Sequence, residues 1–462
     1  MIAHYALLPS DPTTQAHLAV ITATNPGPVS LSIAGHSVPG DSAQIPSRSE
    51  WIHHFRVSGL RPGTPYGWEI AGVGAGLPLR TLPGAMPAGG LVGVALSDIH
   101  TNGAGMAAPS EMDIVAAQAP DFCLLVGDYA NSFREAHGAV SGGFWVEMFR
   151  DYMARLSGET LVPILAIPGN HDVGNHQWDG TGAVNPGGTY FRVFFPNIAD
   201  MAPAGTNYAA PALGDWLQVL AVDSHSTTTA ETAAWLPGQI APDMPLCLPI
   251  VHSPMFAANI RGGNDPVLQA RLRDALFALV HRADNAVFGV CGHIHAQTRT
   301  RPLGLVGAEP GGSAKMALGA QWIVEDPDGY VEVGQGYQND RPGAATQPWF
   351  LEEAEGGRPT FQRIDLAQGS VRLRTIDQVG NAVYTRAWVR PRSRRSQAMR
   401  GGKPVTPIRG GAPVYLKRST GLGLSPSTVI VPGNGLMTVE SLASAAPLSV
   451  AAGDTRVTVE VA

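Results

Sequence analysis

The 462-residue sequence predicts an α/β chain whose main part is a two-sheet β-sandwich flanked by helices, with an all-β region before it and a small β region after it. Three observations predict this order. Short β-type runs between proline and glycine breaks fill residues 1–85, apolar runs alternate with helical patterns over 91–390, and residues 400–462 are again β-like. These three segments are the predicted domains, and the last one has no predicted role.

The first segment is predicted to form strands over 16–23, 29–33 and 51–57, because each is rich in apolar or β-branched residues and bounded by turn formers. Near its end stands Leu60-Arg-Pro-Gly-Thr-Pro-Tyr66. This motif resembles the tyrosine corner of fibronectin type III domains, in which the tyrosine hydroxyl bonds back to the chain. A generic hairpin is the alternative reading.

The main segment contains five short apolar runs, each of which ends at polar residues. Such runs are typical of strands buried on both faces of a sheet. The runs span 91–97, 121–126, 161–168, 244–251 and 286–291, and the residues that follow them include Asp98, His100, Asp128, Asn170, His171, Asp172, His252, His293 and His295. Because ligands bind past the carboxyl ends of parallel strands, we expect these side chains to meet at one rim of a sheet.

Helical patterns separate these strands. Ser110 and Asp113 have the spacing of a capping box for a helix to about residue 119, and residues 144–156 are amphipathic. Asp265 and Pro266 would begin a further helix that ends near 282. Strands are expected again over 329–333, 370–376 and 381–388, where they would form the second sheet of the sandwich.

The polar clusters together indicate a metal centre. Each cluster alone is weak: a Gly-Asp pair such as 127–128 is commonly a turn, and His252 before Ser253-Pro254 suits an ordinary loop. Taken in order, and each at a strand end, they offer seven oxygen or imidazole ligands and no thiolate. Seven ligands are too many for one tetrahedral ion but enough for two ions that share a bridge, an arrangement that activates water for attack on phosphorus.

With these motifs in place, residues 1–390 resemble the calcineurin-like metallophosphoesterase superfamily, and its purple acid phosphatase branch most closely. His252-Ser-Pro-Met-Phe256 is similar to the fourth motif of that branch, and Gly292-His-Ile-His-Ala296 with Arg299 is similar to the fifth. Tyr190-Phe-Arg-Val-Phe-Phe-Pro196 is similar to a segment that follows its Asn-His motif. The resemblance implies the metallophosphoesterase fold, preceded by a fibronectin type III-like domain.

The resemblance also implies roles for the polar residues. It assigns Asp98, His100 and His295 to a first metal ion, and Asn170, His252 and His293 to a second. Asp128 would bridge the two ions, and His171 would face the substrate as general acid, with Asp172 orienting it or a neighbouring ligand. A hydroxide between two divalent ions, either manganese, zinc or iron, would be the nucleophile.

Two departures from the branch affect these expectations. Asn131 stands where the branch has the tyrosine that binds ferric iron, and His100 stands where it has glycine. An imidazole stabilises a trivalent ion less than a phenolate does, so divalent ions and no purple colour are expected. After the fourth motif only Asn259 replaces further histidines, and Gln297 stands in place of an aromatic residue. Phosphodiesters therefore become credible substrates.

Four residues outside the ligand set are also predicted to take part. Asn131, Arg134, His225 and Asn259 are candidate contacts to substrate. A solvated loop is the alternative for Arg134, and a turn is the alternative for the segment that leads to His225.

The predicted function is hydrolysis of a small-molecule phosphoester, as in an acid phosphatase. A phosphodiesterase acting on cyclic nucleotides or phospholipid head groups is the alternative enzyme. A catalytically idle metal-containing binding protein is the alternative of another class. The physiological substrate and the oligomeric state stay open.

Composition limits the remaining classes. The formal net charge of −6, with 31 Lys+Arg against 37 Asp+Glu, gives no basic excess to follow a nucleic acid backbone. No apolar stretch reaches 18 residues, so no membrane span is predicted, and residues 1–10 lack the charged and apolar parts of a signal peptide. The compartment stays open, and Cys123, Cys247 and Cys291 are expected to be buried free thiols.

Overall fold

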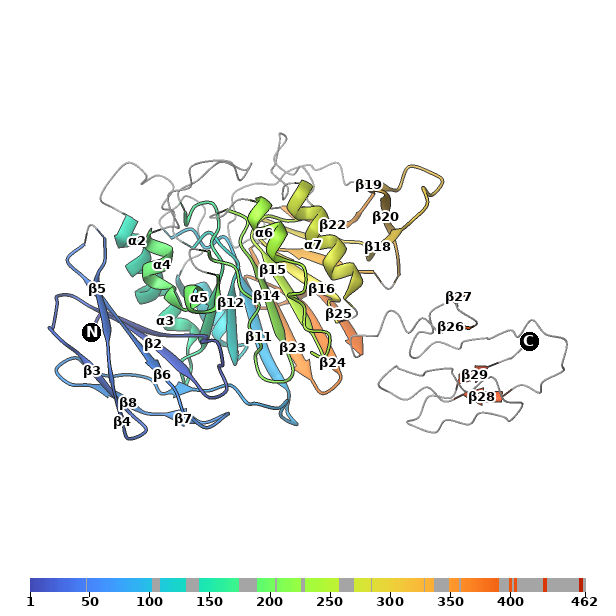
Figure 1. Cartoon of the computed structure of the whole chain (residues 1–462). Coiled ribbons are helices and arrows are strands. Elements are labelled where there is room, and N and C mark those ends of the chain that lie inside the picture. The colour runs from blue at the N-terminus through green and yellow to red at the C-terminus, as the bar shows by residue number, and fades with distance from the viewer. Residues whose placement is uncertain are drawn as a thin grey trace.

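The computed structural model describes residues 1–389 apart from 47, 102–108, 130–140, 174–188, 204–205, 226–228, 257–269, 284, 328, 336–348 and 357–358. Beyond residue 389 it describes four short strands only. The described part is a mixed α/β fold in which two large sheets pack face to face and helices cover their outer faces (Figure 1).

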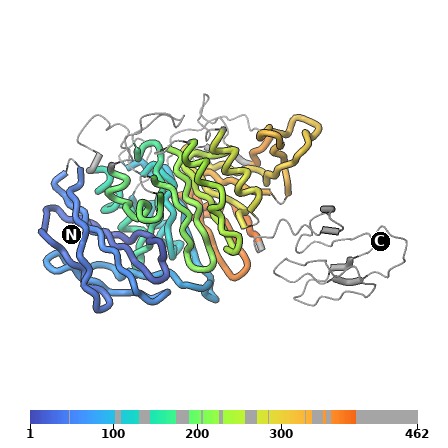
Figure 2. The backbone as a smooth tube through the Cα atoms, viewed as in Figure 1, coloured from blue at the N-terminus to red at the C-terminus, as the bar shows by residue number. Residues whose placement is uncertain are grey.

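The larger sheet has ten strands and joins the first and the last strands of the described core. Its order is β25-β24-β23-β11-β12-β13-β1-β2-β6-β5, with β11, β12, β13 and β1 parallel and the pairs on either side antiparallel. In this order the strands are Ala382–Val389, Ser370–Asp377, Thr360–Ala367, Leu91–Leu96, Phe122–Leu125, Pro163–Ala166, Ala3–Leu7, Ala16–Thr22, Trp51–Val57 and Asp41–Gln44. Figure 2 shows the late part of the chain, in orange, running beside the blue and cyan segment that contains β11.

The second large sheet has six strands, in the order β14-β15-β16-β21-β17-β22. These strands are Gln218–Val222, Cys247–Val251, Phe288–Cys291, Val331–Gly334, Ala296–Thr300 and Leu351–Gly356. Apolar side chains of both sheets share one buried core, and Trp388 of β25 stacks on Phe288 of β16 with ring centroids 4.9 Å apart. The two sheets therefore form the sandwich that the sequence predicts.

Membership of the two sheets differs from the prediction in one respect. The segments 370–376 and 381–388 were expected in the second sheet, but β24 and β25 extend the first sheet through β23. The reason is that β23 pairs antiparallel with the free edge of β11 over five residues, from Leu91 opposite Leu366 to Ala95 opposite Gln362. The segment 329–333 lies in the second sheet as expected, as β21.

The helices are short, and one predicted start is wrong. The expected capping box at Ser110 and Asp113 does not form, because the segment begins with a 3-10 turn and Glu111 precedes the α-helix without a side-chain cap bond. The amphipathic segment 144–156 is helical but contains a π-helical turn, and Asp265 and Pro266 lie outside the described residues. The helices are η1 (Pro109–Glu111), α1 (Met112–Ala116), α2 (Ser141–Glu147), η3 (Met148–Met153), α3 (Ala154–Leu156), α4 (Thr189–Phe194), α5 (Pro196–Met201), α6 (Thr229–Trp235) and α7 (Ala270–Arg282).

The N-terminal strands form a second, smaller sandwich. Strands β4-β3-β8-β9 make a sheet whose apolar side chains, such as Leu31 and Trp68, pack against Leu18 and Phe55 of the ten-stranded sheet. The Tyr66 hydroxyl accepts a hydrogen bond from the backbone N–H of Arg61 at 2.7 Å, which is the contact expected of a tyrosine corner. The additional strands here are β3 (Ser30–Ile33), β4 (His36–Pro39), β7 (Pro65–Tyr66), β8 (Trp68–Ile70), β9 (Gly74–Ala75) and β10 (Leu79–Arg80).

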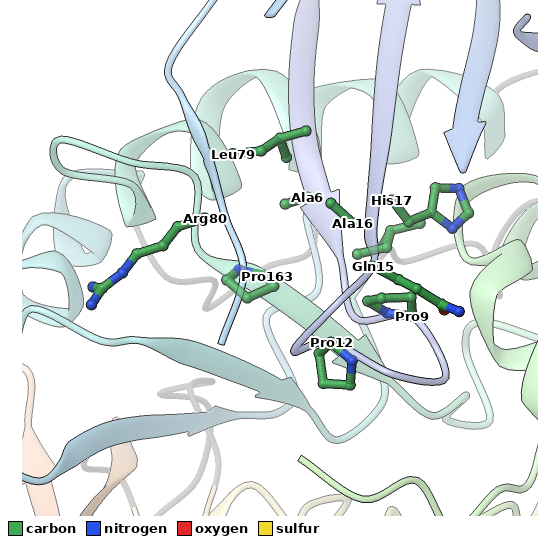
Figure 3. Close-up of a pocket in the computed structure, with 10 residues that line it drawn as sticks. Ala6, Pro9, Pro12, Gln15, Ala16, His17, Leu79, Arg80 and Pro163 are labelled. Atoms are coloured by element: carbon green, nitrogen blue, oxygen red, sulfur yellow. The ribbon is translucent and has the colours of Figure 1, made fainter. Parts of the chain in front are cut away.

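This small sandwich is joined to the main one by direct strand pairing. Strand β1 pairs parallel with β13, with Ala6 opposite Pro163 and Leu7 opposite Ile164. A hollow beside this junction is lined by Ala6, His17 and Pro163, among others (Figure 3). Pro163 is the first residue of β13, so the hollow lies at the end of this strand away from Asn170, which follows the strand's carboxyl end.

The remaining strands lie outside these two sandwiches. Three of them form the sheet β18-β20-β19, and four short ones pair in the C-terminal region. Their bounds are Leu303–Val306, Gln321–Glu325, Met316–Leu318, Met399–Arg400, Lys403–Pro404, Ser427–Val429 and Val457–Val459. No helix within the described ranges is both long and apolar enough to cross a membrane.

Candidate metal centre

The polar clusters follow the carboxyl ends of strands in both large sheets. Asp98, Asp128 and Asn170 come after the parallel neighbours β11, β12 and β13, whereas His252 and His293 come after the parallel neighbours β15 and β16. The sequence predicted one rim of one sheet, which is wrong. The side chains instead meet where the rims of the two facing sheets come together.

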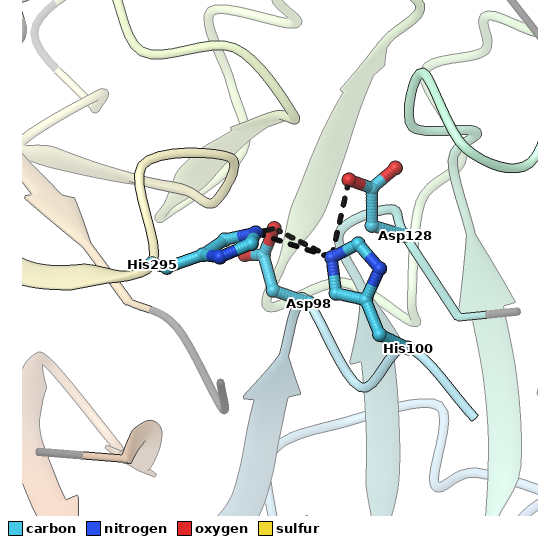
Figure 4. A group of neighbouring side chains, drawn as sticks. All are labelled: Asp98, His100, Asp128 and His295. Carbon is cyan, nitrogen blue, oxygen red and sulfur yellow. Dashed lines mark hydrogen bonds and ion pairs between the residues drawn. The ribbon is translucent and has the colours of Figure 1, made fainter. Parts of the chain in front are cut away.

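Four side chains form the first half-site: Asp98, His100, Asp128 and His295. One ligand atom of each lies within 4.8 Å of the others, and all four residues are buried. The Nε2 atoms of His100 and His295 are 3.1 Å apart, and Oδ1 of Asp98 is 3.3 Å from Nε2 of His295. In Figure 4 the four side chains converge on one space from three different loops. Two carboxylates and two imidazoles suit a divalent transition-metal ion.

The second half-site consists of Asp128, Asn170, His252 and His293. Asp128, His252 and His293 form a second group with ligand atoms within 4.8 Å. Nε2 of His252 lies 3.2 Å from Nδ1 of His293 and 3.2 Å from Oδ1 of Asn170. Four atoms able to bind a cation thus surround this space, one of them supplied by the first half-site.

Asp128 is common to both half-sites, and one of its oxygens has no hydrogen-bond partner among the described residues. This atom is the buried Oδ2, which lies 3.2 Å from Nε2 of His252 and 3.5 Å from Nε2 of His100. A buried carboxylate oxygen without a partner is costly unless a cation binds it. The orphaned atom lies between two converging ligand groups, so these residues fit a pair of metal ions.

The backbone at the ligands adopts an unusual conformation. Among the described residues, seven that are not glycine have a positive φ, and five of them are Asp98 (57°), His100 (47°), Asp128 (59°), His293 (73°) and His295 (50°). This left-handed conformation costs about 1–3 kcal/mol for residues with a Cβ. Such strain persists only where the surrounding structure imposes it, and here it directs side chains from tight turns into one space.

Asp172 holds the loop that carries Asp128. Its Oδ2 accepts hydrogen bonds from the backbone N–H groups of Asp128 at 2.6 Å and Gly169 at 2.8 Å, and its Oδ1 accepts one from Tyr129 at 3.0 Å. A side chain at Gly169 would overlap the Asp128 carboxylate, which explains the glycine there. Asp172 therefore fixes the backbone of the shared ligand.

Hydrogen bonds also fix the ring of His252. Its Nδ1 lies 2.7 Å from the Val126 carbonyl oxygen, so Nδ1 donates to that oxygen and Nε2 faces Asp128 and Asn170. A second contact of this kind places Asp98, because the backbone N–H of His293 donates to both of its oxygens at 3.0 and 2.9 Å. Such outer contacts orient metal ligands.

The protonation of the centre without metal follows from its crowding. Burial opposes a charged His252, but the Asp128 carboxylate raises its pKa to about 9. Burial and then the charge of Asp128 raise the pKa of Asp172 to about 8. Burial and the neighbouring His252 lower the pKa of His293, so this imidazole is neutral and ready to act as a ligand.

His171 lies at the more open side of the centre. Its side chain is 19% exposed, against at most 8% for the imidazoles of His100, His252 and His295. Its ring packs edge-on against His100 with centroids 4.4 Å apart, and its Nε2 is 3.9 Å from Oδ2 of Asp128. It is thus close to the shared ligand while remaining reachable from outside.

Of the candidate substrate contacts, His225 is the one within the described residues, and it lies at the centre. Its ring centroid is 5.3 Å from that of His252 and 6.0 Å from that of His293, and its Nε2 lies 2.9 Å from the Ser253 hydroxyl. Asn131, Arg134 and Asn259 lie outside the described residues. Gln297 is buried in β17 and its Oε1 has no hydrogen-bond partner within the described part.

Sequence reasoning missed two residues next to the centre. The Tyr129 hydroxyl donates to the Leu125 carbonyl oxygen at 2.7 Å and accepts from the Gly127 N–H at 2.8 Å, which braces the loop before Asp128. Glu332 lies buried in β21 and bonds to the loop after His252. The sequence does contain a signal for Glu332, because it stands between two valines in an apolar run and buried carboxyl groups are rare.

Residues 94–297 match the family model described as calcineurin-like phosphoesterase. A solved structure of PhoD has a TM-score of 0.59 and 11% identity, covering 84% of this chain and 88% of that one. This likeness shows the fold, and it reaches well beyond residues 94–297.

Two further solved structures have TM-scores too low to support an argument. A predicted phosphoesterase of Streptococcus pneumoniae TIGR4 has a TM-score of 0.26 and 10% identity, covering 66% of this chain and 99% of its own. A Vps29 single mutant of Entamoeba histolytica has a TM-score of 0.25 and 10% identity, covering 64% and 98%. The comparison with curated proteins gives no match.

Proposed function

The chain belongs to the calcineurin-like phosphoesterases through its residues 94–297, and on that premise we propose that it hydrolyses phosphoesters with two divalent metal ions. The observation that supports this most directly is the unpaired Oδ2 of Asp128, toward which the ligand groups of both half-sites converge. When bound, such ions supply hydroxide at neutral pH and polarise the phosphoryl group.

The proposed ligands follow the two half-sites. Asp98, His100 and His295 would hold the first ion, Asn170, His252 and His293 would hold the second, and Asp128 would bind both. Manganese, zinc and ferrous iron all suit this set of oxygen and imidazole ligands. Asp172 would keep the Asp128 loop in place rather than touch substrate, because its oxygens accept three backbone N–H groups.

His171 is the proposed general acid. Its ring is the most exposed of the four imidazoles compared above, and it lies beside His100 and Asp128. From there it would donate a proton to the leaving alkoxide, a contribution of about 10²–10⁴-fold to turnover. His225 would bind the substrate from the side of the second half-site, together with Ser253.

Phosphodiesters, such as cyclic nucleotides or phospholipid head groups, are the second candidate substrates. The D-x-H motif at Asp98 and His100 resembles the first motif of metal-dependent diesterases. Both residues lie in the first half-site, and Oδ1 of Asp98 is 3.8 Å from Nε2 of His100. Phosphomonoesters are favoured by the resemblance to acid phosphatases, whose branch assignment remains a proposal.

The experiment is metal analysis followed by turnover of a nitrophenyl phosphate monoester and the corresponding bis-ester. We expect two equivalents of bound metal and hydrolysis of one ester at least ten times faster than the other. Two equivalents of metal without hydrolysis of any ester in a wider phosphoester panel would favour a catalytically idle binding protein. Fewer than two equivalents would refute the paired centre.

The N-terminal sandwich is proposed to be a scaffold. One face of β2 and β6 shares an apolar cluster with β3 and β8, whereas Tyr5, Ile21 and Ile52 pack into the core of the large sheets, so the small sandwich is continuous with the main one. Its pairing through β1 and β13 would hold one side of the strand that leads to Asn170. Residues 91–390 would then be the catalytic domain, and 400–462 a further region without a proposed role.

A further inference from the structure

Glu332 is a buried carboxyl group outside every motif of the metal centre. It lies in the middle of β21, between Val331 and Val333, and only 2% of its surface is exposed. The two valines belong to the core between the large sheets. Because side chains alternate along a strand, Glu332 points to the opposite face.

Both carboxyl oxygens of Glu332 bind the backbone of one loop. The N–H of Met255 donates to Oε1 and the N–H of Phe256 donates to Oε2, each at 2.8 Å. The backbone N–H of Glu332 donates in turn to the Thr300 hydroxyl at 2.9 Å, on the neighbouring strand β17. Within the described part, Glu332 forms no ion pair, and its carboxylate accepts hydrogen bonds from this loop alone.

The loop clamped by Glu332 begins at His252. Residues 252–256 follow β15, and the His252 carbonyl oxygen accepts a hydrogen bond from the Gly292 N–H at 2.9 Å. At Phe256, the last described residue of this segment, the ring is buried and packs edge-on against Phe277 of α7, with centroids 5.1 Å apart. Residues 252–256 are therefore held at His252 by the Gly292 N–H, and at Met255 and Phe256 by Glu332.

We propose that Glu332 is a positioning residue of the second half-site, which holds the His252 loop so that the imidazole stays in reach of Asp128 and Asn170. This inference rests on the proposed two-metal function. None of the four ligands of the first half-site lies on the clamped loop. Loss of the clamp should therefore weaken the second ion selectively.

The test variant is Glu332→Gln, which keeps the size of the side chain. One amide oxygen can still accept a backbone N–H, but the amide nitrogen that replaces the other oxygen cannot. Glu332→Asp is the second variant, because its carboxylate is one methylene too short to reach the loop. Thr300→Val is the matched control, since it removes the other hydrogen bond of Glu332 and leaves the clamp in place.

The measurement is the stepwise binding of Zn²⁺ to metal-free protein by competition with a chromophoric chelator. In both Glu332 variants we expect the second dissociation constant to rise about 10–100-fold, the usual cost of losing an outer contact to a metal site. The first constant should stay within about twofold of the wild type, as should both constants of Thr300→Val. Excess Zn²⁺ should restore turnover with KM unchanged.

Three outcomes would overturn the inference. In the first, both Zn²⁺ dissociation constants of the Glu332 variants equal those of the wild type. In the second, both constants rise equally and the melting temperature falls, so that Glu332 has only a structural role. Fast hydrogen exchange at the Met255 and Phe256 amides of the wild type would show that the clamp is absent, even if the variants failed to fold. A wild type that binds two Zn²⁺ but hydrolyses nothing would refute the proposed function and leave this test intact.

Discussion

The two half-sites of the proposed metal centre share one carboxylate but are built differently. The first half-site has a carboxylate of its own in Asp98, whereas the second adds only neutral ligands to Asp128. All four ligands of the first half-site stand on left-handed backbone, but in the second only Asp128 and His293 do. His252 is instead placed by contacts from Val126 and from its loop.

The two proposed ions should therefore bind with different strength. Two carboxylates attract a divalent ion more strongly than one, because each adds a full negative charge in a buried space. Left-handed turns set the backbone of all four ligands of the first half-site, while His252 of the second is held by hydrogen bonds from its ring to Val126 and from its loop to Glu332. We therefore expect the first ion to bind more tightly and the second to respond more to changes elsewhere in the molecule.

The largest effect is expected for Asp128, because this residue belongs to both half-sites. Asp128→Ala should lose both ions and reduce phosphoester turnover to background, because each half-site loses a carboxylate. Metal content after gel filtration, measured by mass spectrometry, checks this. The exposed Asp243→Ala is the matched control and should keep both ions. Unchanged metal content in Asp128→Ala would refute the bridge.

Single-site variants should separate the two ions. Asp98→Ala should lose the first ion and retain part of the second, and His252→Ala should lose the second while the first stays bound. A chelator added in steps to the wild type should likewise remove one ion before the other. If each variant lost both ions, the two half-sites would be a single cooperative site and the comparison would fail.

His171 should affect turnover without affecting either ion. Because it is a proposed proton donor and not a ligand, His171→Ala should lower kcat about 10²–10⁴-fold with two equivalents of metal still bound. Leaving groups of low pKa, which need no proton, should suffer less from the substitution. Full activity of the metal-loaded variant would remove His171 from the mechanism.

The smallest expected effect is on the number of protons released when metal binds. The pKa of His252 is raised to about 9 in the metal-free centre, so the imidazole is protonated at pH 7.5 and must lose that proton to become a ligand. Metal affinity should therefore rise with pH until about pH 9. Calorimetry in two buffers of different ionisation enthalpy should show about one proton fewer released by His252→Ala than by the wild type, and equal release would contradict the assignment.

The local parts of the fold were predictable. The apolar runs before Asp98, Asp128 and His252 are strands, with ends within a few residues of the expected positions. The amphipathic segment 144–156 is helical. The predicted helix cap at Ser110 is wrong, because a cap depends on the backbone angles of a single residue.

The grouping of the strands was only partly predictable. The sequence indicated a sandwich, but it did not indicate that β24 and β25 join the first sheet, or that β1 pairs with β13 across more than 150 residues. An unpaired strand edge accepts any strand of suitable length, so the choice is made by packing and not by local pattern.

Which side chains end the buried strands could thus be predicted from local sequence, since burial and the turn that follows it leave a pattern of residue types. The packing of the whole chain was needed to bring the rims of two different sheets together, to place His225 next to His252, and to let Glu332 reach the loop after His252. These contacts join residues that are up to 195 positions apart, and their energy depends on the whole packed core rather than on any segment alone.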